Sequence, residues 1–469
     1  MSRLASICII FWWISPTALA QSQATAGIVE VQEILISGPN TTKRHVIERE
    51  LDFAVGDTLS MNDLMETLER NEKRLLSCGL FNRAKFHIHC IDLEHCGLSV
   101  ELQLNENWYI YPGIIFELAD RNFNVWWKTY NFDFDRVNYG ARFDHINLTG
   151  NKDRLKLLFQ RGYIEKYELA YGLPYISEGK GLSFNVFFAE AREINIRTRE
   201  SRQQFVALPS NEKLANRFRV GVNYSNRIDA FTTSDWNLQY HNNWVHPILI
   251  SDQNPNYFPT GGSRIRYLSL EYNLVHDQRI LPIYPEGGHL YFLQIKKDGL
   301  GILENGENFS LAIGGEKYFK PHPNIIWGGR IKLRYNLDRS TQGYFNYTAL
   351  GYGDNIKGYE LYVIDGKDYA LLKTAWRFRL IQKNIHLGKL MPFKRMRTMP
   401  LLLFFRLSTE VAYVNDPVTQ ADNPFSKRAL VGYGPAIDLM MYYNFSMSAE
   451  YNINHLGQRG FYLNSSFSF

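Results

Sequence analysis

Residues 351–366, GYGDNIKGYELYVIDG, contain glycines close enough together to suggest a loop that binds phosphate. Such a loop needs the spacing G-x-G-x-x-G between a strand and a helix, because backbone N–H groups then surround the phosphate. Gly351, Gly353 and Gly358 do not have this spacing, and no strand-to-helix pattern surrounds them. The stretch therefore argues against a nucleotide site and leaves a plain surface turn or a loop of another kind.

Metal-binding side chains gather in one short segment of the sequence, at His87, His89, Cys90, His95 and Cys96. Histidine and cysteine are the usual ligands of zinc, so the residue types are suitable. Alternation along a strand, however, directs His87 and His89 to one face and Cys90 to the other. We therefore predict no metal site and expect a disulfide between Cys90 and Cys96 in an oxidising compartment. Cys78 is then left as a core thiol.

Motifs with a known catalytic mechanism are missing from the sequence, which has no G-x-S-x-G, no H-E-x-x-H and no Walker A pattern. We therefore predict a protein that is not an enzyme and needs no cofactor. The formal net charge of +5 is too small for the basic surface of a nucleic-acid-binding protein. Nucleic acid is not an expected partner.

Residues 1–20 have the features of a secretory signal peptide. Arg3 precedes an apolar stretch over 4–14, and residues 18–20, Ala-Leu-Ala, form a small-x-small cleavage site. The apolar stretch is short for a transmembrane helix, although a retained anchor is the alternative. The sequence thus predicts export, with the mature chain beginning near Gln21.

Aromatic residues make up 14% of the chain, with 29 Tyr and 30 Phe. After the signal, the longest compact apolar run is 399–405, which is too short to span a bilayer as a helix. This profile is typical of an outer-membrane β-barrel, and secreted β-sandwiches share part of it.

Alternating residues favour the barrel. Leu372, Trp376 and Leu380 lie on one face of an expected strand over 370–381, and charged residues lie on the other. The same alternation occurs in 267–274, 330–336 and 405–413. One face towards lipid and one towards water is the pattern of a barrel strand. Because an open sheet edge is unstable in lipid, we expect the sheet to close.

Basic residues crowd the polar face of neighbouring expected strands, at Arg330, Lys332, Arg334, Lys373, Arg377 and Arg379. One interpretation is an electropositive lumen that guides a polypeptide or an anion. The other, which we favour, is the ordinary polarity of a barrel interior. Its expected counter-charges are Glu271, Glu410, Asp438 and Glu450.

Residues 108–469 are long enough for an even number of strands, between about 14 and 18, and we expect about 16. The chain ends FYLNSSFSF, so that Phe467 and Phe469 share a face of the last expected strand. A terminal strand that ends in Phe resembles the recognition signal of barrels assembled in the outer membrane, although an aromatic-rich chain can also end this way by composition alone.

The segment 27–106 has a different pattern. A strand over 28–36 precedes a helical pattern over 43–51, and Ser60 with Asp63 is typical of the start of a second helix. Two further strands follow. The order β-α-α-β-β predicts one small α+β domain.

Taken together, these segments resemble the BamA/TpsB superfamily, the bacterial surface antigen D15-like outer-membrane barrels, here with a single POTRA domain. GPNTTKRHVIERELDFAVGD, RLLSCGLFNRAKF and LSVELQLNENWYIYPG are similar to a POTRA domain that leads into a barrel. Residues 138–162 and 276–288 (HDQRILPIYPEGG) are similar to strand and hairpin patterns of that barrel.

Residues 351–366 are similar to the superfamily's sixth extracellular loop, whose core reads Val-Arg-Gly followed by Phe or Tyr. The resemblance implies a loop that folds back into the barrel, where its basic residue bonds to acidic or backbone groups of the inner wall. The corresponding residues are Ile356, Lys357, Gly358, Tyr359, Glu360, Asp365 and Gly366. Lysine replaces the usual arginine, and its point charge lacks the bidentate fork of a guanidinium.

The resemblance also implies a function. It places the barrel in the outer membrane of a Gram-negative-type envelope with the POTRA domain in the periplasm, and implies insertion or translocation of proteins. The implied partners are membrane lipid, an unfolded polypeptide held by the POTRA domain and the barrel seam, and an accessory periplasmic protein or lipoprotein. The alternative is a passive, porin-like diffusion channel.

Overall fold

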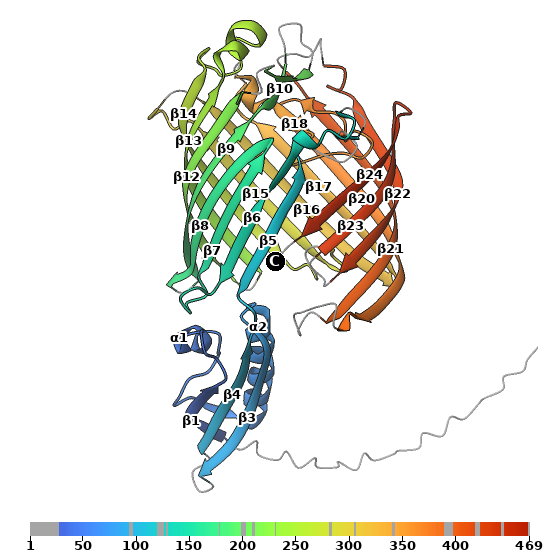
Figure 1. The fold of residues 1–469 in the computed structure, drawn as a ribbon. Helices are drawn as coiled ribbons and strands as arrows, with labels where there is room; N and C mark the ends of the chain where they lie inside the picture. Colours follow the sequence, from blue (N-terminus) through green and yellow to red (C-terminus); the bar gives the residue numbers. More distant parts are fainter. Residues whose placement is uncertain are drawn as a thin grey trace, which may run out of the picture. The chain divides into compact units, whose positions relative to one another are not determined.

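The computed structural model divides the chain into two compact units, Met1–Asn107 and Trp108–Phe469 (Figure 1). The residues that it describes are 28–92, 97–119, 126–127, 130–177, 179–197, 203–208, 212–229, 231–280, 284–303, 306–339, 343–388, 397–417, 423–441 and 445–467. The expected signal peptide lies outside these residues.

The N-terminal unit is a small α+β domain. Its elements are β1 (Ile28–Ser37), α1 (Arg44–Glu48), β2 (Thr58–Ser60), α2 (Met61–Ser77), β3 (Phe81–Asp92) and β4 (Gly97–Glu106). They form a four-stranded sheet in the order β2-β1-β4-β3. The order agrees with the predicted β-α-α-β-β pattern except for β2, which is only three residues long and therefore too short to give a periodic signal.

Helix α2 begins where the capping pattern predicts, because the Ser60 hydroxyl accepts a hydrogen bond of 3.1 Å from the Asp63 N–H. Leu64 and Leu68 pack against the sheet, whereas Met65 is 54% exposed. Helix α1 is shorter than the expected 43–51 and buries Val46 and Ile47.

The C-terminal unit is built on one antiparallel sheet of 16 strands, which Figure 1 shows curling into a barrel. In sheet order from the first edge, the strands are β5 (Ile110–Leu118), β6 (Val137–Ile146), β7 (Arg154–Gly162), β8 (Ile164–Ser177), β9 (Lys180–Ala191), β12 (Ala215–Arg227), β13 (Thr232–Val245), β14 (Arg264–Asp277), β15 (Gly288–Asp298), β16 (Asn308–His322), β17 (Ile325–Asn336), β20 (Asp368–His386), β21 (Thr398–Asn415), β22 (Ala429–Met441), β23 (Phe445–Asn454) and β24 (Arg459–Phe467). The predicted mainly β fold with about 16 strands is confirmed.

Two small two-stranded sheets lie outside this sheet, β10 (Glu193–Arg197) with β11 (Gln203–Ala207), and β18 (Thr348–Leu350) with β19 (Ile364–Asp365). They belong to connections at one end of the barrel, which we call the loop end. The opposite end, where β5 begins, we call the turn end.

Strand register separates an apolar face from a polar one. Ile331 of β17 pairs with Leu372 of β20, and these side chains are 49% and 48% exposed on the outside. The adjacent pair, Arg330 and Lys373, points to the inside, as alternation requires. The barrel therefore has an apolar outer surface and a polar lumen.

The two edges of the sheet are β5 and β24. Over the described residues, no backbone hydrogen bonding joins them to each other. Ile114 and Phe116 on β5 are 93% and 72% exposed, more than outward-facing residues in the middle of the sheet. Over the described residues, the first and last strands are therefore the two open edges of the sheet, and we call this pair of edges the seam.

Within the part of the chain that the structure describes, no helix has both the length and the apolar character needed to cross a membrane.

Candidate functional site

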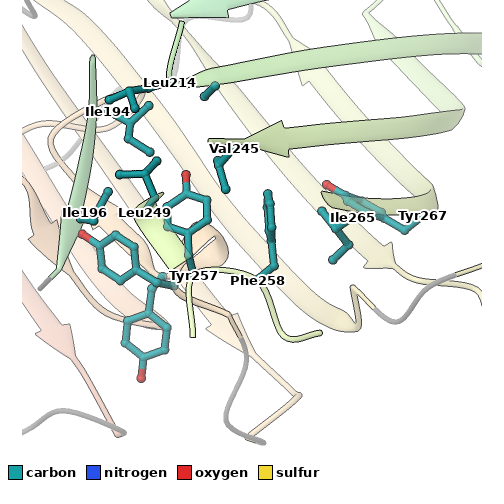
Figure 2. Packing of buried hydrophobic residues seen from close by; sticks show 12 residues of the cluster. Ile194, Ile196, Leu214, Val245, Leu249, Tyr257, Phe258, Ile265 and Tyr267 are labelled. Carbon is teal, nitrogen blue, oxygen red and sulfur yellow. The ribbon is translucent and has the colours of Figure 1, made fainter. Parts of the chain in front are cut away.

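The connection between β17 and β20, residues 337–367, starts at the loop end and is fixed there by neighbouring connections. Tyr344 packs in an apolar cluster with Tyr257, which lies on the connection between β13 and β14 (Figure 2). The N–H groups of Tyr344 and Phe345 donate to the carbonyls of Asn256 and Tyr257 at 2.9 and 3.1 Å. Backbone hydrogen bonds and apolar packing thus both fix the base of the connection.

The middle of this connection lies inside the barrel and carries Lys357. The Lys357 ammonium forms an ion pair with Glu450 of β23, and its backbone N–H donates to Glu410 of β21 at 3.0 Å. The Lys357 side chain is only 12% exposed and Glu450 only 4%. A buried ion pair of this kind is costly to break from one side, because the remaining buried charge loses a partner.

Side chains of β23 and of the turn after it hold the neighbouring residues. The Asn454 side-chain amide donates to the Gly358 carbonyl at 2.8 Å, and the Tyr359 hydroxyl bonds to a ring nitrogen of His455. Ile356 and Tyr359 are 1% and 2% exposed. The segment Ile356–Tyr359 therefore rests against β22, β23 and the turn that follows β23.

The loop and the barrel wall can approach each other closely because each has a glycine at the contact. Gly358 has φ +78°, a backbone conformation that side-chain-bearing residues rarely adopt. Gly432 of β22 lies directly beneath, and a Cβ atom there would overlap the carbonyl oxygen of Lys357. The wall and the loop are therefore matched at a position where neither has a side chain.

Glu450 connects Lys357 to further buried charges. Arg406 of β21 donates to Glu450 at 2.7 Å and to both oxygens of Asp438 of β22 at 2.7 and 3.0 Å. Asp438 is 1% exposed. We call Lys357, Glu450, Arg406 and Asp438 the lumen network. Each acidic member is hydrogen-bonded to a basic one, which is the arrangement that makes buried charge tolerable.

Glu360 lies beside this network. Its carboxylate accepts a hydrogen bond of 2.6 Å from the Asn452 side chain. Burial is the largest influence on it and raises its pKa to about 7, although Lys357 nearby opposes the change. The loop thus holds a carboxyl group that changes charge near neutral pH.

The last two residues of the expected signature support the end of the loop. Asp365 is 1% exposed, and its backbone carbonyl accepts from the Asn423 amide at 2.9 Å. The Gly366 N–H donates to the Tyr347 carbonyl at 2.7 Å, and a Cβ at Gly366 would overlap Val414. These residues act structurally on the return to β20.

The basic residues predicted for the lumen point inward, and each has an acidic or carbonyl partner. Lys332 pairs with Asp354 of the loop at 2.7 Å, and Lys373 pairs with Glu410 at 3.2 Å. Arg330 lies 3.5 Å from the carboxylate of Glu316.

The remaining three also have partners. Arg334 donates to the Thr348 carbonyl at 3.5 Å. Arg377 donates to the Pro285 carbonyl at 2.8 Å, and Arg379 pairs with Glu286. The contacts describe a lumen in which basic residues hold inserted segments rather than an open positive channel.

Two participants lack a contiguous sequence motif. Arg406 was visible only as a charged residue on an alternating strand, and Tyr284 only as part of a hairpin-like stretch. Tyr284 donates to Asp438 at 2.7 Å across 154 positions of sequence. For Arg406, the only available indication was the alternation that places it on the inner face of its strand. Tyr284 lies between two prolines, where no alternation indicates the direction of its side chain.

Other expected sites fall partly outside the described residues. Phe467 lies on β24 and pairs with Phe445, and the Phe467 side chain and Phe469 lie outside the described residues. The Cys90 side chain and Cys96 also lie outside, so the disulfide stays a prediction. The Cys78 thiol donates to the Leu75 carbonyl at 3.0 Å. No group of three metal-binding side chains occurs among the residues that the structure describes.

Comparison with known proteins places this geometry in context. Residues 29–106 match the POTRA family, described as surface antigen variable number repeat. BamA from Haemophilus ducreyi lacking POTRA domains 1-3 is similar in structure, with a TM-score of 0.59 and 12% sequence identity over 93% of this chain and 84% of that one. The fold is that of the BamA/TpsB superfamily, with a single POTRA domain.

Two further solved structures agree with this POTRA-and-barrel fold. CdiB from Escherichia coli has a TM-score of 0.53 and 10% identity, over 97% of this chain and 93% of that chain. CdiB from Acinetobacter baumannii has a TM-score of 0.56 and 11% identity, over 94% and 74%. No curated protein matches the chain in sequence.

Proposed function

We propose that this protein inserts polypeptides into the outer membrane or moves them across it. The observation that carries the proposal is the combination of an unpaired seam between β5 and β24 with a lumen occupied by the loop that bears Lys357. An unpaired strand edge is a template for another strand. An occupied lumen keeps the barrel closed when no substrate is present.

The proposed location follows from the two surfaces of the barrel. The outer face is apolar and suits lipid, and residues 1–20 have the features of an export signal. In this arrangement the POTRA domain lies in the periplasm, the turn end of the barrel faces the periplasm, and the loop end faces the exterior.

The proposed work needs no covalent chemistry. β3 is a twelve-residue edge strand of the POTRA sheet and can add a strand of an unfolded polypeptide by backbone hydrogen bonding. The edges β5 and β24 can do the same within the membrane plane. Membrane lipid, an unfolded polypeptide and an accessory periplasmic protein or lipoprotein are the partners we propose. A passive diffusion channel is disfavoured, because the loop that bears Lys357 lies inside the lumen and is held there by Glu450 and Glu410.

The test is a set of Lys357 variants in a strain depleted of the native protein. Lys357→Ala leaves Glu450 with Arg406 as its remaining cation and weakens the buried contact by roughly 3 kcal/mol. We expect Lys357→Ala to lower the temperature at which the folded band is lost on gels, to raise the frequency of channel openings in planar bilayers, and to reduce the same outer-membrane or exported proteins that depletion reduces.

Two variants serve as controls. Lys357→Arg keeps the charge and should support the proteome, and Lys180→Ala removes an exposed lysine and should behave like the parent. Altered conductance with an unchanged outer-membrane proteome in every variant and in the depleted strain would instead identify a diffusion channel.

A further inference from the structure

The connection between β14 and β15 at the turn end bends into the lumen. A bridge between Ile280 and Gly287 closes its base, and Tyr284 beyond this base is only 8% exposed. Tyr284 contacts Phe404 of β21, with ring centroids 4.8 Å apart. Since β21 is not a neighbour of β14 or β15 in the sheet, Tyr284 must reach across the interior.

The residues that contact this segment form a specific binding site for it. The Arg377 guanidinium lies 4.3 Å from the centre of the Tyr284 ring and donates to the Pro285 carbonyl at 2.8 Å. Glu286 pairs with Arg379, and with Lys320 at 2.9 Å. Three consecutive residues of the connection thus have specific partners, which an ordinary short turn does not require. We call residues 284–287 the inturned segment.

The inturned segment and the Lys357 loop meet on the lumen network. The Tyr284 hydroxyl donates to Asp438 at 2.7 Å. Arg406 joins Asp438 to Glu450, and Glu450 pairs with Lys357. Side chains that arrive from opposite ends of the barrel therefore compensate the same set of buried charges.

We propose that the inturned segment and the Lys357 loop are two closures of the lumen whose release is coupled through Arg406, Asp438 and Glu450. The side chains of this network are little exposed, with Arg406 at 12%, Glu450 at 4% and Asp438 at 1%, so the attraction between their charges is stronger than it would be in water. Departure of either segment admits water to the network, so that the charges facing the other segment are solvated and its release costs less. The coupling is reciprocal, as any equilibrium coupling between two sites must be.

This coupling is additional to the proposed function. It rests on that function only for the assignment of the inturned segment to the periplasmic end of the barrel. In those terms, a polypeptide that displaces the inturned segment from the periplasmic side also loosens the external loop. A barrel with two independent closures would respond only at the end that is touched.

The test measures release at each closure while the other is altered. Ile356 and Pro285 are both buried, so Ile356→Cys reports release of the loop and Pro285→Cys reports release of the inturned segment. The rate of maleimide labelling in outer-membrane vesicles is followed on the peptide that carries each new cysteine. Tyr284→Ala should accelerate labelling of Ile356→Cys, and Lys357→Ala should accelerate labelling of Pro285→Cys, each by about tenfold, as couplings between sites typically do.

Ile280→Ala is the matched control, because Ile280 belongs to the same connection but is 61% exposed. It should leave both labelling rates at the parent value. If Tyr284→Ala prevents folding, shown by loss of the heat-modifiable band, Tyr284→Phe keeps the ring and removes only the bond to Asp438, and should give a smaller acceleration in the same direction. Labelling rates equal to those of Ile280→Ala in both directions would overturn the coupling, whatever the outer-membrane proteome shows.

Discussion

A single carboxylate, Glu450, explains how lysine can serve at position 357, where the sequence resemblance led us to expect arginine. One oxygen of Glu450 accepts from Arg406, and the other pairs with Lys357. A guanidinium at position 357 would have only one free oxygen to bind, so its bidentate geometry would bring no advantage. We therefore expect Lys357→Arg to be tolerated without tightening the loop.

Glu360 predicts that the loop is held more firmly in acid than in base. Its pKa is raised by burial from 4.5 to about 7, so the folded loop favours the protonated carboxyl. This contribution is fully present below pH 4.5 and is lost as the pH rises through about 7, by up to ~3 kcal/mol. The frequency of channel openings should therefore rise between pH 5.5 and pH 8.

The control for this effect is Glu360→Gln, which keeps the shape and the acceptor for Asn452 but does not titrate. The groups that face Glu360 include Lys357, Glu450 and the Tyr462 hydroxyl, and they are unchanged in this variant. An equal pH response in the parent and in Glu360→Gln would assign the response to another group.

At the residue scale, the sequence identified sites whose residues are adjacent in the chain better than sites whose residues are brought together by the fold. The segment around Lys357 stands out because its residues are adjacent. Which cation meets Asp438 or Glu450 depends on the register between strands far apart in the sequence, and a period of two gives the face of a residue but not its register. The pairings within the lumen network could therefore not be assigned from the sequence, although Asp438 and Glu450 were expected as inward counter-charges.

Among the elements, strand β22 and the Lys357 loop form an interface that depends on backbone proximity. Gly432 has no room for a side chain beneath the Lys357 carbonyl. The strands themselves were predictable because lipid and water impose strict alternation on both faces. Short elements such as β2 and β18 were not, since three residues carry no period.

We expect the variant Gly432→Ala to release the loop, because it adds a methyl group where the loop contacts β22. The new Cβ would overlap the Lys357 carbonyl, and because β22 is fixed on both sides by β21 and β23, the loop must move. Overpacking of this kind costs about 1–3 kcal/mol. We expect a lower temperature for loss of the folded band and faster labelling of Ile356→Cys. Gly353→Ala adds the same methyl group where nothing lies within 4 Å and should have neither effect.

At the scale of the whole molecule, the barrel differs from a simple closed cylinder at one place. β5 is paired with β6 on one side, and Pro112 on β5 lacks the N–H group that a central strand would use. Ile114 and Phe116 on β5, at 93% and 72%, are more exposed than the outward-facing apolar side chains described on the other strands of the sheet. An edge of this kind is prepared to receive a strand but is not held by one.

The seam therefore predicts where a polypeptide substrate first contacts the barrel. A photoreactive phenylalanine analogue at Phe116, on β5, should cross-link in cells to a β-rich outer-membrane or exported polypeptide that is also reduced on depletion of this protein. The same analogue at Phe159 is the matched control. Phe159 also faces outward, but it lies on β7, which is paired with β6 on one side and with β8 on the other. Lipid contacts both positions, so lipid adducts are expected at each and do not discriminate. A polypeptide cross-link of equal yield at Phe159 would show that substrate contact is not confined to the seam, and a complete lack of polypeptide cross-links at Phe116 would argue against strand addition at β5.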